Sequence, residues 1–344
     1  FKFDDALDAY QVLLGIKKEP YLGIVLEYGD LAAKNAENAK IERRVDFKPQ
    51  IDTNQRKYRD GICEDKCGFV DKDKVGVSFI GAGNFAKAVL LPTLKKIKNA
   101  EFRGVSTATG MSATDTAKKY GFSFAATDQG EVLRDESTNL VFVTTRHDMH
   151  ATQIKAALEA GKYVFSEKPL CINENQLDAV LAAKDAENAK GALSHVMIGF
   201  NRRFSPHAKL LKEYFSKRTL PLVMHYRVNA GSIPKDIWLQ DSDIGGGRMV
   251  GEGCHFIDFM SYVCGAAVVK VQAMCIKTPN GAETPEDSIS VNLQFADGSV
   301  GTLEYVALGD TTLPKEFCEI HGEGSTATMD NFCKTVCTGK LGKR

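Results

Sequence analysis

The sequence has no excess of charge of either sign. Lysine plus arginine and aspartate plus glutamate each total 44 among 344 residues, which gives a formal net charge of +0 at pH 7. No block of basic residues of the kind that follows a phosphate backbone or an anionic lipid surface interrupts this balance. The composition therefore argues against nucleic acid as a partner.

Long apolar runs are also missing. No stretch approaches the roughly 20 apolar residues that cross a bilayer. The N-terminal residues 1–6 have neither the charge order nor the apolar core of a signal peptide. We therefore expect no membrane association and a cytoplasmic location.

The cysteines form no disulfide framework. Nine is an odd number, and the thiols are scattered along the chain, which favours reduced cysteines. Cys63 and Cys67, like Cys333 and Cys337, are separated by three residues, but no complementary set of Cys and His stands beside either pair. The sequence therefore predicts no metal site.

The length and the 43% of hydrophobic residues are enough for two or three domains. Residues 1–73 are predicted to be a remnant of an upstream domain followed by a polar linker. Strands and helices alternate in residues 74–200, which predicts an α/β Rossmann domain with a doubly wound parallel sheet. Residues 201–344 contain two helices and then mostly strands, which predicts an α+β domain with a large open antiparallel sheet.

The expected elements follow from periodicity and turn residues. The strands of the first domain are predicted at 75–80, 102–106, 140–145, 162–166 and 193–199, and its helices at 84–98, 112–120, 150–160 and 173–188. The second domain is predicted to have helices near 205–217 and 249–263, a strand near 221–229, and a hairpin over 288–306 that turns at Asp297-Gly298.

The first predicted strand runs into a G-x-G-x-x-A turn, Gly81-Ala-Gly83-Asn84-Phe85-Ala86. Gly81 permits a tight bend, Gly83 lets the backbone approach a pyrophosphate, and Ala86 allows close packing of helix on strand. Free N–H groups at the start of the following helix suit a phosphate. The turn therefore predicts a dinucleotide site.

The choice between NAD and NADP stays open at this stage. An acidic residue at the end of the second strand favours NAD, but Glu101 lies at the wrong end of that strand. Ser106 and Thr107 are predicted to contact the adenosine ribose, and no arginine is present there to select the 2′-phosphate. After the next buried strand, the predicted cofactor contacts are Thr144, Thr145 and His150, although the histidines in this loop are equally consistent with a solvent position.

Lys168 is the candidate catalytic lysine. It follows a strand and precedes Pro169, so it lies at the carboxyl edge of the sheet in a stiff loop whose X-Pro bond can be cis. A lysine fixed there can stabilise the oxyanion that develops as a hydride leaves for a nicotinamide. Glu167 and Pro169 are predicted to contact the cofactor with it.

His255 is the candidate acid/base. It lies on a predicted helix after the glycine run 245–247, and Glu252 stands three residues before it on the same face. Imidazole can take a hydroxyl proton near neutral pH when a neighbour orients the ring. A structural histidine is the alternative, but the glycines allow a ligand to come close.

Four motifs occur in a fixed order, and together they resemble the glucose-fructose oxidoreductase / inositol dehydrogenase (Gfo/Idh/MocA) family over residues 74–330. These are the glycine turn 81–86, Glu167-Lys-Pro169, Gly199-Phe-Asn-Arg-Arg-Phe204, and Gly245-Gly-Gly through His255-Phe-Ile-Asp258. The resemblance implies a Rossmann domain followed by an open sheet through which family members assemble, here as a homodimer or homotetramer. It also implies catalytic roles for Lys168 and His255, with Asn201, Arg202 and Arg203 near nicotinamide and substrate.

One departure from the family pattern concerns the histidine. Many family dehydrogenases place an aspartate four residues before it, and Gly251 occupies that position here. We hypothesise that Glu252 takes over the orienting role. Asp236 and Trp238 are further predicted sugar contacts, Trp238 because an indole face can stack on a pyranose ring.

These motifs and the family resemblance together imply an NAD(P)-dependent oxidoreductase that acts on a hydroxyl or keto carbon of a sugar or sugar nucleotide, with a role in polysaccharide biosynthesis. Two alternatives are an enzyme that retains NAD for redox-assisted elimination, isomerisation or glycoside cleavage, and a nucleotide-sensing protein without turnover. Residues 1–28 resemble the last helix and strand of a zinc-type medium-chain dehydrogenase. This implies a longer chain with such a domain upstream, as in bidomain oxidoreductases.

Overall fold

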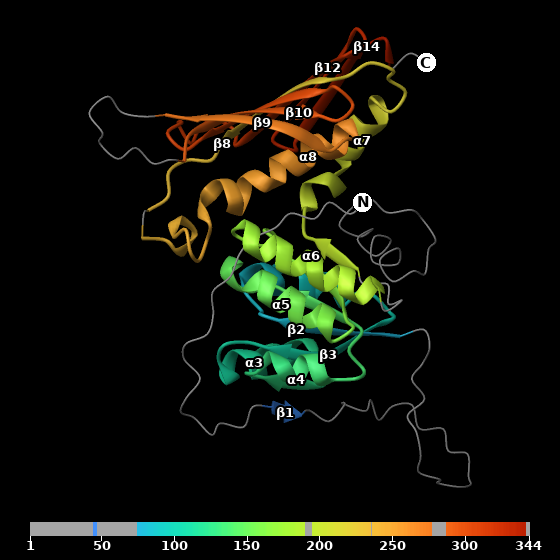
Figure 1. The fold of residues 1–344 in the computed structure, drawn as a ribbon, viewed down its shortest axis with the longest axis vertical. Coiled ribbons are helices and arrows are strands. Elements are labelled where there is room, and N and C mark those ends of the chain that lie inside the picture. Colours follow the sequence, from blue (N-terminus) through green and yellow to red (C-terminus); the bar gives the residue numbers. More distant parts are fainter. Residues whose placement is uncertain (1–43, 47–73, 190–194, 235, 277–286, 342–344) are drawn as a thin grey trace.

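The computed structural model describes residues 44–46, 74–189, 195–234, 236–276 and 287–341. The predicted helix and strand within residues 1–28 lie outside these ranges. Two bodies follow one another along the chain: a parallel sheet layered between helices, and a second sheet with helices on one face (Figure 1).

The first body is the predicted Rossmann domain. Its sheet has the order β1-β4-β3-β2-β5-β6-β7, and all neighbouring pairs are parallel except β1 with β4. The strands are β1 (Arg44–Asp46), β2 (Val75–Ile80), β3 (Ala100–Ser106), β4 (Phe124–Ala126), β5 (Leu140–Val143), β6 (Tyr163–Ser166) and β7 (Val196–Ile198). Because the chain winds outward from β2 in both directions, the loops after β2 and β5 flank the topological switch point, where ligands bind in such sheets.

Helices cover both faces of this sheet. One apolar core lies under η3 (Ala86–Leu90), α2 (Leu91–Leu94) and α3 (Gly110–Tyr120), and the other under α4 (Gln129–Arg134), α5 (His147–Glu159) and α6 (Glu174–Ala189). Local signals set the ends of α3: the Thr109 side chain accepts a hydrogen bond from Ser112 N, and Gly121 ends the helix with φ +85°.

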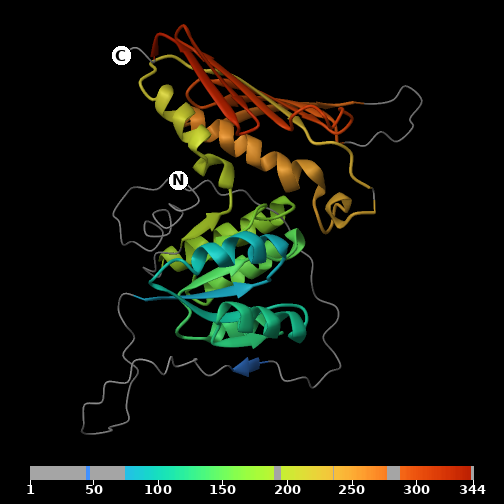
Figure 2. The same cartoon turned by 180° about the vertical axis from the view of Figure 1, so that it is seen from behind.

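The second body is the C-terminal sheet domain. Its sheet has the order β14-β13-β12-β8-β11-β10-β9. The strands are β8 (Val223–Asn229), β9 (Val268–Cys275), β10 (Ile289–Phe295), β11 (Val300–Val306), β12 (Glu316–Gly322), β13 (Ser325–Asp330) and β14 (Lys334–Gly339). Helices α7 (Pro206–Tyr214) and α8 (Cys254–Cys264) lie on the face turned toward the Rossmann domain, and the other face is open (Figures 1 and 2).

The structure differs from the sequence expectations in three places. Arg44–Asp46, predicted as linker, adds an exposed edge strand to the Rossmann sheet. The short elements β4 and α4 were not predicted, because three and six residues carry too little periodicity. The predicted antiparallel sheet is mixed, since β8 pairs with β11 in parallel; the partner of a strand across a long connection is not set by local pattern.

Candidate functional site

The glycine turn is open toward the switch point. Gly81 has φ +87°, and a Cβ there would lie 2.8 Å from the carbonyl carbon and oxygen of Thr144, so no larger residue fits. Gly83, Asn84 and Phe85 are exposed, and the helix that follows begins with Lys87 N donating to Gly83 O at 3.0 Å. The N–H groups that start a helix have no partner within it, so this end suits a diphosphate. Ala86 is buried beneath it, as predicted for close packing.

The end of β3 presents little polar side chain to a ribose. Ser106 is buried, and its carbonyl accepts a hydrogen bond from Gly81 N at 2.8 Å. The Thr107 hydroxyl donates to Thr109 O at 2.8 Å. Residues 106–109 contain neither a carboxylate nor a guanidinium. Of the two predicted ribose contacts, Thr107 is partly exposed and Ser106 is buried.

The loop after β5 is held by its own hydrogen bonds. Thr144 donates to Gly81 O at 2.9 Å, and Thr145 donates to the Gln153 side chain at 2.6 Å. His150 is 1% exposed, with Nδ1 2.6 Å from Pro169 O and Nε2 3.1 Å from Thr145 O. This corrects the prediction for His150: its ring nitrogens face protein carbonyls, so it fixes the loops and is not available to a cofactor.

Lys168 reaches from the Rossmann domain to the C-terminal domain. The Lys168–Pro169 bond is cis, and Nζ donates to the carbonyl of Gly251 at 2.7 Å. Gly251 belongs to η6 (Met249–Gly253), the turn that leads into α8. Lys168 and His255 line the same cavity of about 220 Å³. The two residues singled out from sequence are therefore brought together at the junction of the domains.

Hydrogen bonds from the start of α5 hold the glycine run in place. His147 Nδ1 lies 2.8 Å from Gly245 O, and Asp148 N donates to Ile244 O at 3.1 Å. Because a carbonyl only accepts, His147 carries its proton on Nδ1. Burial lowers the pKa of His147 to about 3. A Cβ on Gly251 would lie 3.0 Å from His147 Cε1, so this ring occupies the space into which a side chain at position 251 would point.

His255 is buried and neutral. It is 5% exposed, and its Nδ1 has no hydrogen-bond partner among the described residues. Burial lowers the pKa of His255 well below its usual range, and the nearby cations of Arg202, Lys168 and Lys315 lower it further. The ring can therefore accept a proton at neutral pH, although the low pKa makes it a weak base.

Glu252 does not orient His255. Its carboxylate accepts a hydrogen bond from Tyr305 Oη at 2.5 Å and pairs with Lys315 Nζ at 2.5 Å. Those bonds hold the pKa of Glu252 below its usual value, against the effect of burial. The hypothesis that Glu252 replaces the aspartate missing at Gly251 is corrected here, because both oxygens face β11 and the loop before β12. Glu252 still lines the cavity.

Two neighbouring arginines have different positions. Arg202, in η4 (Asn201–Phe204), lines the cavity and is held by Glu316 through bonds of 2.9 and 2.6 Å. Arg203 points instead to the buried carboxylate of Asp258 on α8. The prediction of Arg203 as a substrate contact is corrected, because this ion pair joins η4 to α8. Asn201 is exposed and is not among the described residues that line the cavity.

Glu167 lies beside Lys168, with its carboxyl group buried. Burial raises the pKa of its carboxyl to about 7, and the adjacent Lys168 ammonium partly opposes that shift. A Cβ on Gly199 would lie 2.9 Å from Glu167 Oε1, so the glycine leaves room for the carboxyl group.

The predicted sugar contacts Asp236 and Trp238 lie outside the cavity lining. Asp236 is exposed. Trp238, in η5 (Trp238–Gln240), packs edge to face on His147 with ring centroids 4.8 Å apart. The indole edge contact therefore joins η5 to the start of α5, and the stacking of Trp238 on a sugar stays a prediction. Its neighbour Leu239 lines the cavity instead.

Several site residues were not found from sequence. The cavity is completed by Ile233, Gly247 and Arg248, of which Arg248 stood within the quoted glycine motif without an assigned role. Glu316, which fixes Arg202, lies more than a hundred residues away from it and carries no local signal.

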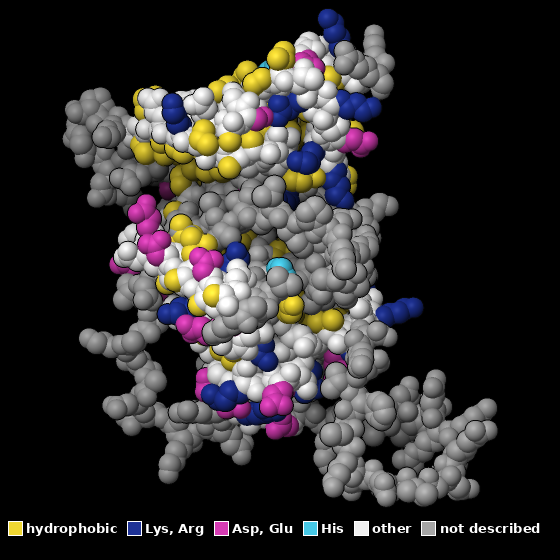
Figure 3. Space-filling view, turned by 45° about the vertical axis from the view of Figure 1, so that its right-hand side comes forward, with side chains coloured by type: hydrophobic (Ala, Val, Ile, Leu, Met, Phe, Trp, Pro, Cys, Tyr) yellow, Lys and Arg dark blue, Asp and Glu magenta, His cyan; other side chains and the backbone are white. Residues whose placement is uncertain are grey.

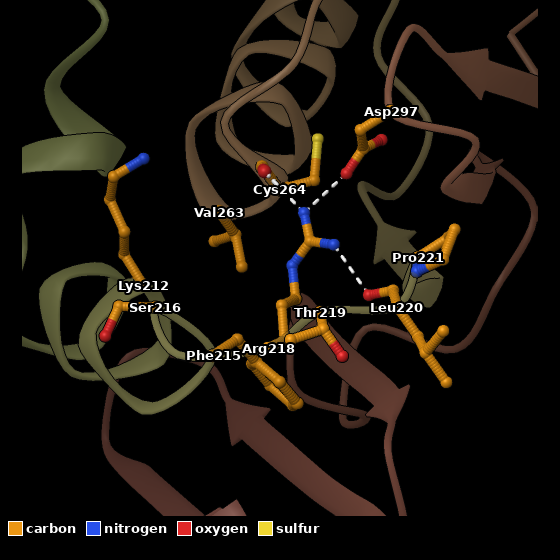
Figure 4. A pocket seen from close by; sticks show the side chains of 10 residues that line it. All are labelled: Lys212, Phe215, Ser216, Arg218, Thr219, Leu220, Pro221, Val263, Cys264 and Asp297. Carbon is orange, nitrogen blue, oxygen red and sulfur yellow. Dashed lines mark hydrogen bonds and ion pairs between the residues drawn. The ribbon is translucent and has the colours of Figure 1, made fainter.

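A second cavity of about 400 Å³ lies at the other end of α8 (Figure 4). Its central Arg218 donates to the carbonyls of Leu220 and Cys264 and to the Asp297 carboxylate. Lys212 donates to Tyr262 O. The cations there are engaged with the protein, and the described residues that line this cavity all belong to the C-terminal domain, so the cavity lies apart from the dinucleotide site.

Two parts of the chain match known families. Residues 75–200 match the oxidoreductase family with an NAD-binding Rossmann fold, and residues 220–328 match the GFO/IDH/MocA C-terminal domain. Levoglucosan dehydrogenase of Pseudarthrobacter phenanthrenivorans is 27% identical over 62% of this chain and 61% of its own length. Myo-inositol 2-dehydrogenase of Thermotoga maritima is 27% identical over 67% of both chains. A solved structure of levoglucosan dehydrogenase with NADH and L-sorbose superposes with a TM-score of 0.65 at 23% identity, covering 77% of this chain and 76% of that one.

Proposed function

Because this chain belongs to the Gfo/Idh/MocA family of NAD(P)-dependent oxidoreductases, we propose that it transfers a hydride between a nicotinamide cofactor and a hydroxyl-bearing or keto carbon of a sugar or sugar nucleotide. The observation that carries the proposal is the position of Lys168 and His255 on one cavity, each supplied by a different domain. The relatives named for levoglucosan and myo-inositol support a polyhydroxylated substrate.

The residues at the switch point fit a dinucleotide. The glycine turn is exposed, a helix begins directly behind it, and the loops after β2 and β5 lie against each other through the Thr144–Gly81 bond. Gly81, Gly83, Asn84, Phe85 and Ala86 would hold the diphosphate. When bound, the nicotinamide accepts or donates the hydride.

Lys168 and His255 divide the proton and charge chemistry. Lys168 Nζ, held on the carbonyl of Gly251, has further N–H donors for a substrate oxygen and stabilises the negative charge that develops there. The neutral ring of His255 takes the hydroxyl proton. A substrate oxygen that accepts a hydrogen bond from the ring N–H stabilises the protonated ring, which raises the pKa of His255 in the complex.

The test is the Lys168→Met variant. A screen of free sugars, uronates and nucleotide sugars with NAD or NADP, followed at the absorbance of the reduced nicotinamide, first identifies a substrate. Lys168→Met is then expected to lower kcat/KM by about 100-fold to 10,000-fold while NADH affinity changes little. Lys155→Met, at an exposed position of α5, is the matched control. Net NADH formation separates a dehydrogenase from redox-assisted elimination, and a threefold effect or less would remove Lys168 from the chemistry.

We also propose that the open face of the C-terminal sheet pairs with a second copy. Hydrophobic side chains gather on this domain (Figure 3). Those exposed at outward strand positions are Val223, Met274, Val300 and Val336. Light scattering on the wild type and a Val223→Glu, Val300→Glu variant tests this, and a monomeric wild type contradicts it.

A further inference from the structure

The cavity that contains Lys168 and His255 is strongly biased toward positive charge. We propose that the substrate carries an anionic group, a carboxylate or phosphate on the sugar, and that Arg248 and Arg202 bind it. This inference rests on the proposed function, since it concerns the substrate of the same site.

The charges around the cavity do not cancel. Its lining contains three cationic side chains, Lys168, Arg202 and Arg248, and one carboxylate, Glu252. The ion pairs behind it add one group of each sign, Lys315 and Glu316. Glu167 offsets this only in part, because burial raises the pKa of its carboxyl to about 7. The site therefore has an excess of positive charge even with its ion pairs counted.

Arg248 is held by backbone carbonyls more closely than by any carboxylate. Its side chain is 7% exposed, and its guanidinium donates to the carbonyls of Gly231 and Ala230. The nearest carboxylate, Glu252, is 3.8 Å away and already binds Tyr305 and Lys315. A guanidinium has five N–H donors, so others stay available to a ligand. A buried, poorly compensated arginine is costly without a ligand anion, because burial removes its hydration.

Arg202 lies on the same cavity in a fixed orientation. Its Nε and one terminal nitrogen bind Glu316, and its guanidinium stacks 4.8 Å over the Phe256 ring. The remaining terminal nitrogen has no hydrogen-bond partner within the described part of the chain and can add a second contact to an anion held by Arg248. In the proposed function, Lys168 binds the substrate oxygen that reacts. The two arginines are therefore the cations that can bind the anionic group.

The electrostatic effect of these cations extends to His255, on the same cavity. Every charged neighbour that perturbs the pKa of His255 is a cation, and all of them lower it. The cavity volume of about 220 Å³ is below the roughly 300–1,000 Å³ common for ligand sites. It therefore suits one charged sugar ring better than an entire nucleotide sugar.

The experiment compares matched ligands on the wild-type protein with NADH bound. Calorimetry measures the binding of D-glucuronate against D-glucose, D-galacturonate against D-galactose, and D-glucose 6-phosphate against D-glucose. At least one acid is expected to bind about tenfold to 100-fold more tightly than its neutral counterpart, as for a hydrogen bond to a charged group. The carboxylate and phosphate arms show which anion the site prefers. Equal or weaker binding of every acid would overturn the proposal.

Two variants assign the preference to the cavity. Arg248→Gln is expected to remove most of the acid-to-neutral affinity ratio, whereas Arg134→Gln, at a 66% exposed position on α4, is expected to leave it unchanged. A ratio that survives Arg248→Gln in a folded protein would exclude Arg248 as the anion contact. Wild-type protein that binds NADH and turns over neutral sugars without any acid preference would refute this inference and leave the proposed function intact. Wild-type protein that binds neither NADH nor NADPH would refute the proposed function itself.

Discussion

Replacing His147 by asparagine is expected to make the protein less sensitive to acid. The folded state keeps this ring neutral because it is buried, with its pKa lowered from 6.5 to about 3; the nearby charge of Lys168 contributes in the same direction. The unfolded chain takes up a proton near pH 6.5, but the folded protein does so only near pH 3. Between these values the unfolded state binds more protons, so stability falls as the pH falls.

The magnitude follows from the same shift. Each pH unit within the window costs about 1.4 kcal/mol of unfolding free energy. From pH 6.5 to about pH 5 the wild type therefore loses about 2 kcal/mol through His147 alone. His150 and His255 are also buried with lowered pKa values, so they add to the acid sensitivity of the wild type. They remain in the His147→Asn variant, and their effect cancels in the difference between the two proteins.

Urea unfolding at several pH values measures this difference. Trp238 is the only tryptophan of the chain, and its indole packs on His147, so its fluorescence reports on this junction. Asparagine keeps an N–H donor for the carbonyl of Gly245. His321→Asn, at a side chain that is 49% exposed, serves as the control and is expected to follow the wild-type curve. Parallel pH dependences of wild type and His147→Asn would refute the reasoning, since the ring would then titrate alike in both states.

Two further predictions concern packing at the site. Arg203→Met is expected to destabilise the protein by about 3–5 kcal/mol, because it leaves Asp258 buried without its cation. Urea unfolding measures this loss, and adding Asp258→Asn is expected to restore part of the stability. No recovery in the double variant would contradict the prediction. Gly251→Asp introduces the aspartate of the family pattern. It is expected to lower the free energy of unfolding by about 1–3 kcal/mol, because the new side chain overpacks against the ring of His147. Adding His147→Ala should remove most of that cost, and an equal loss of thermal stability in both backgrounds would show that the clash with His147 is not the cause.

The features that local sequence determines were predictable. The glycine turn, the buried strands of the Rossmann sheet and the β10–β11 hairpin each have a short pattern whose geometry follows from steric limits on a few residues. The position of Lys168 was predictable as well, because a lysine that follows a parallel strand and precedes a proline lies at the carboxyl edge of the sheet. The family motifs also predicted that Lys168 and His255 lie at the same site.

The tertiary structure alone decided which polar groups face the cavity and which face the protein. Arg202 and Arg203 are adjacent in sequence, yet one lines the cavity and the other binds Asp258. Glu252 has the right helical spacing to reach His255, but Tyr305 and Lys315 bind its carboxylate first. A side chain makes the bonds that its spatial neighbours offer, and those neighbours come from strands far away in the chain. Sequence spacing therefore located the candidate residues, and long-range hydrogen bonds determined their partners.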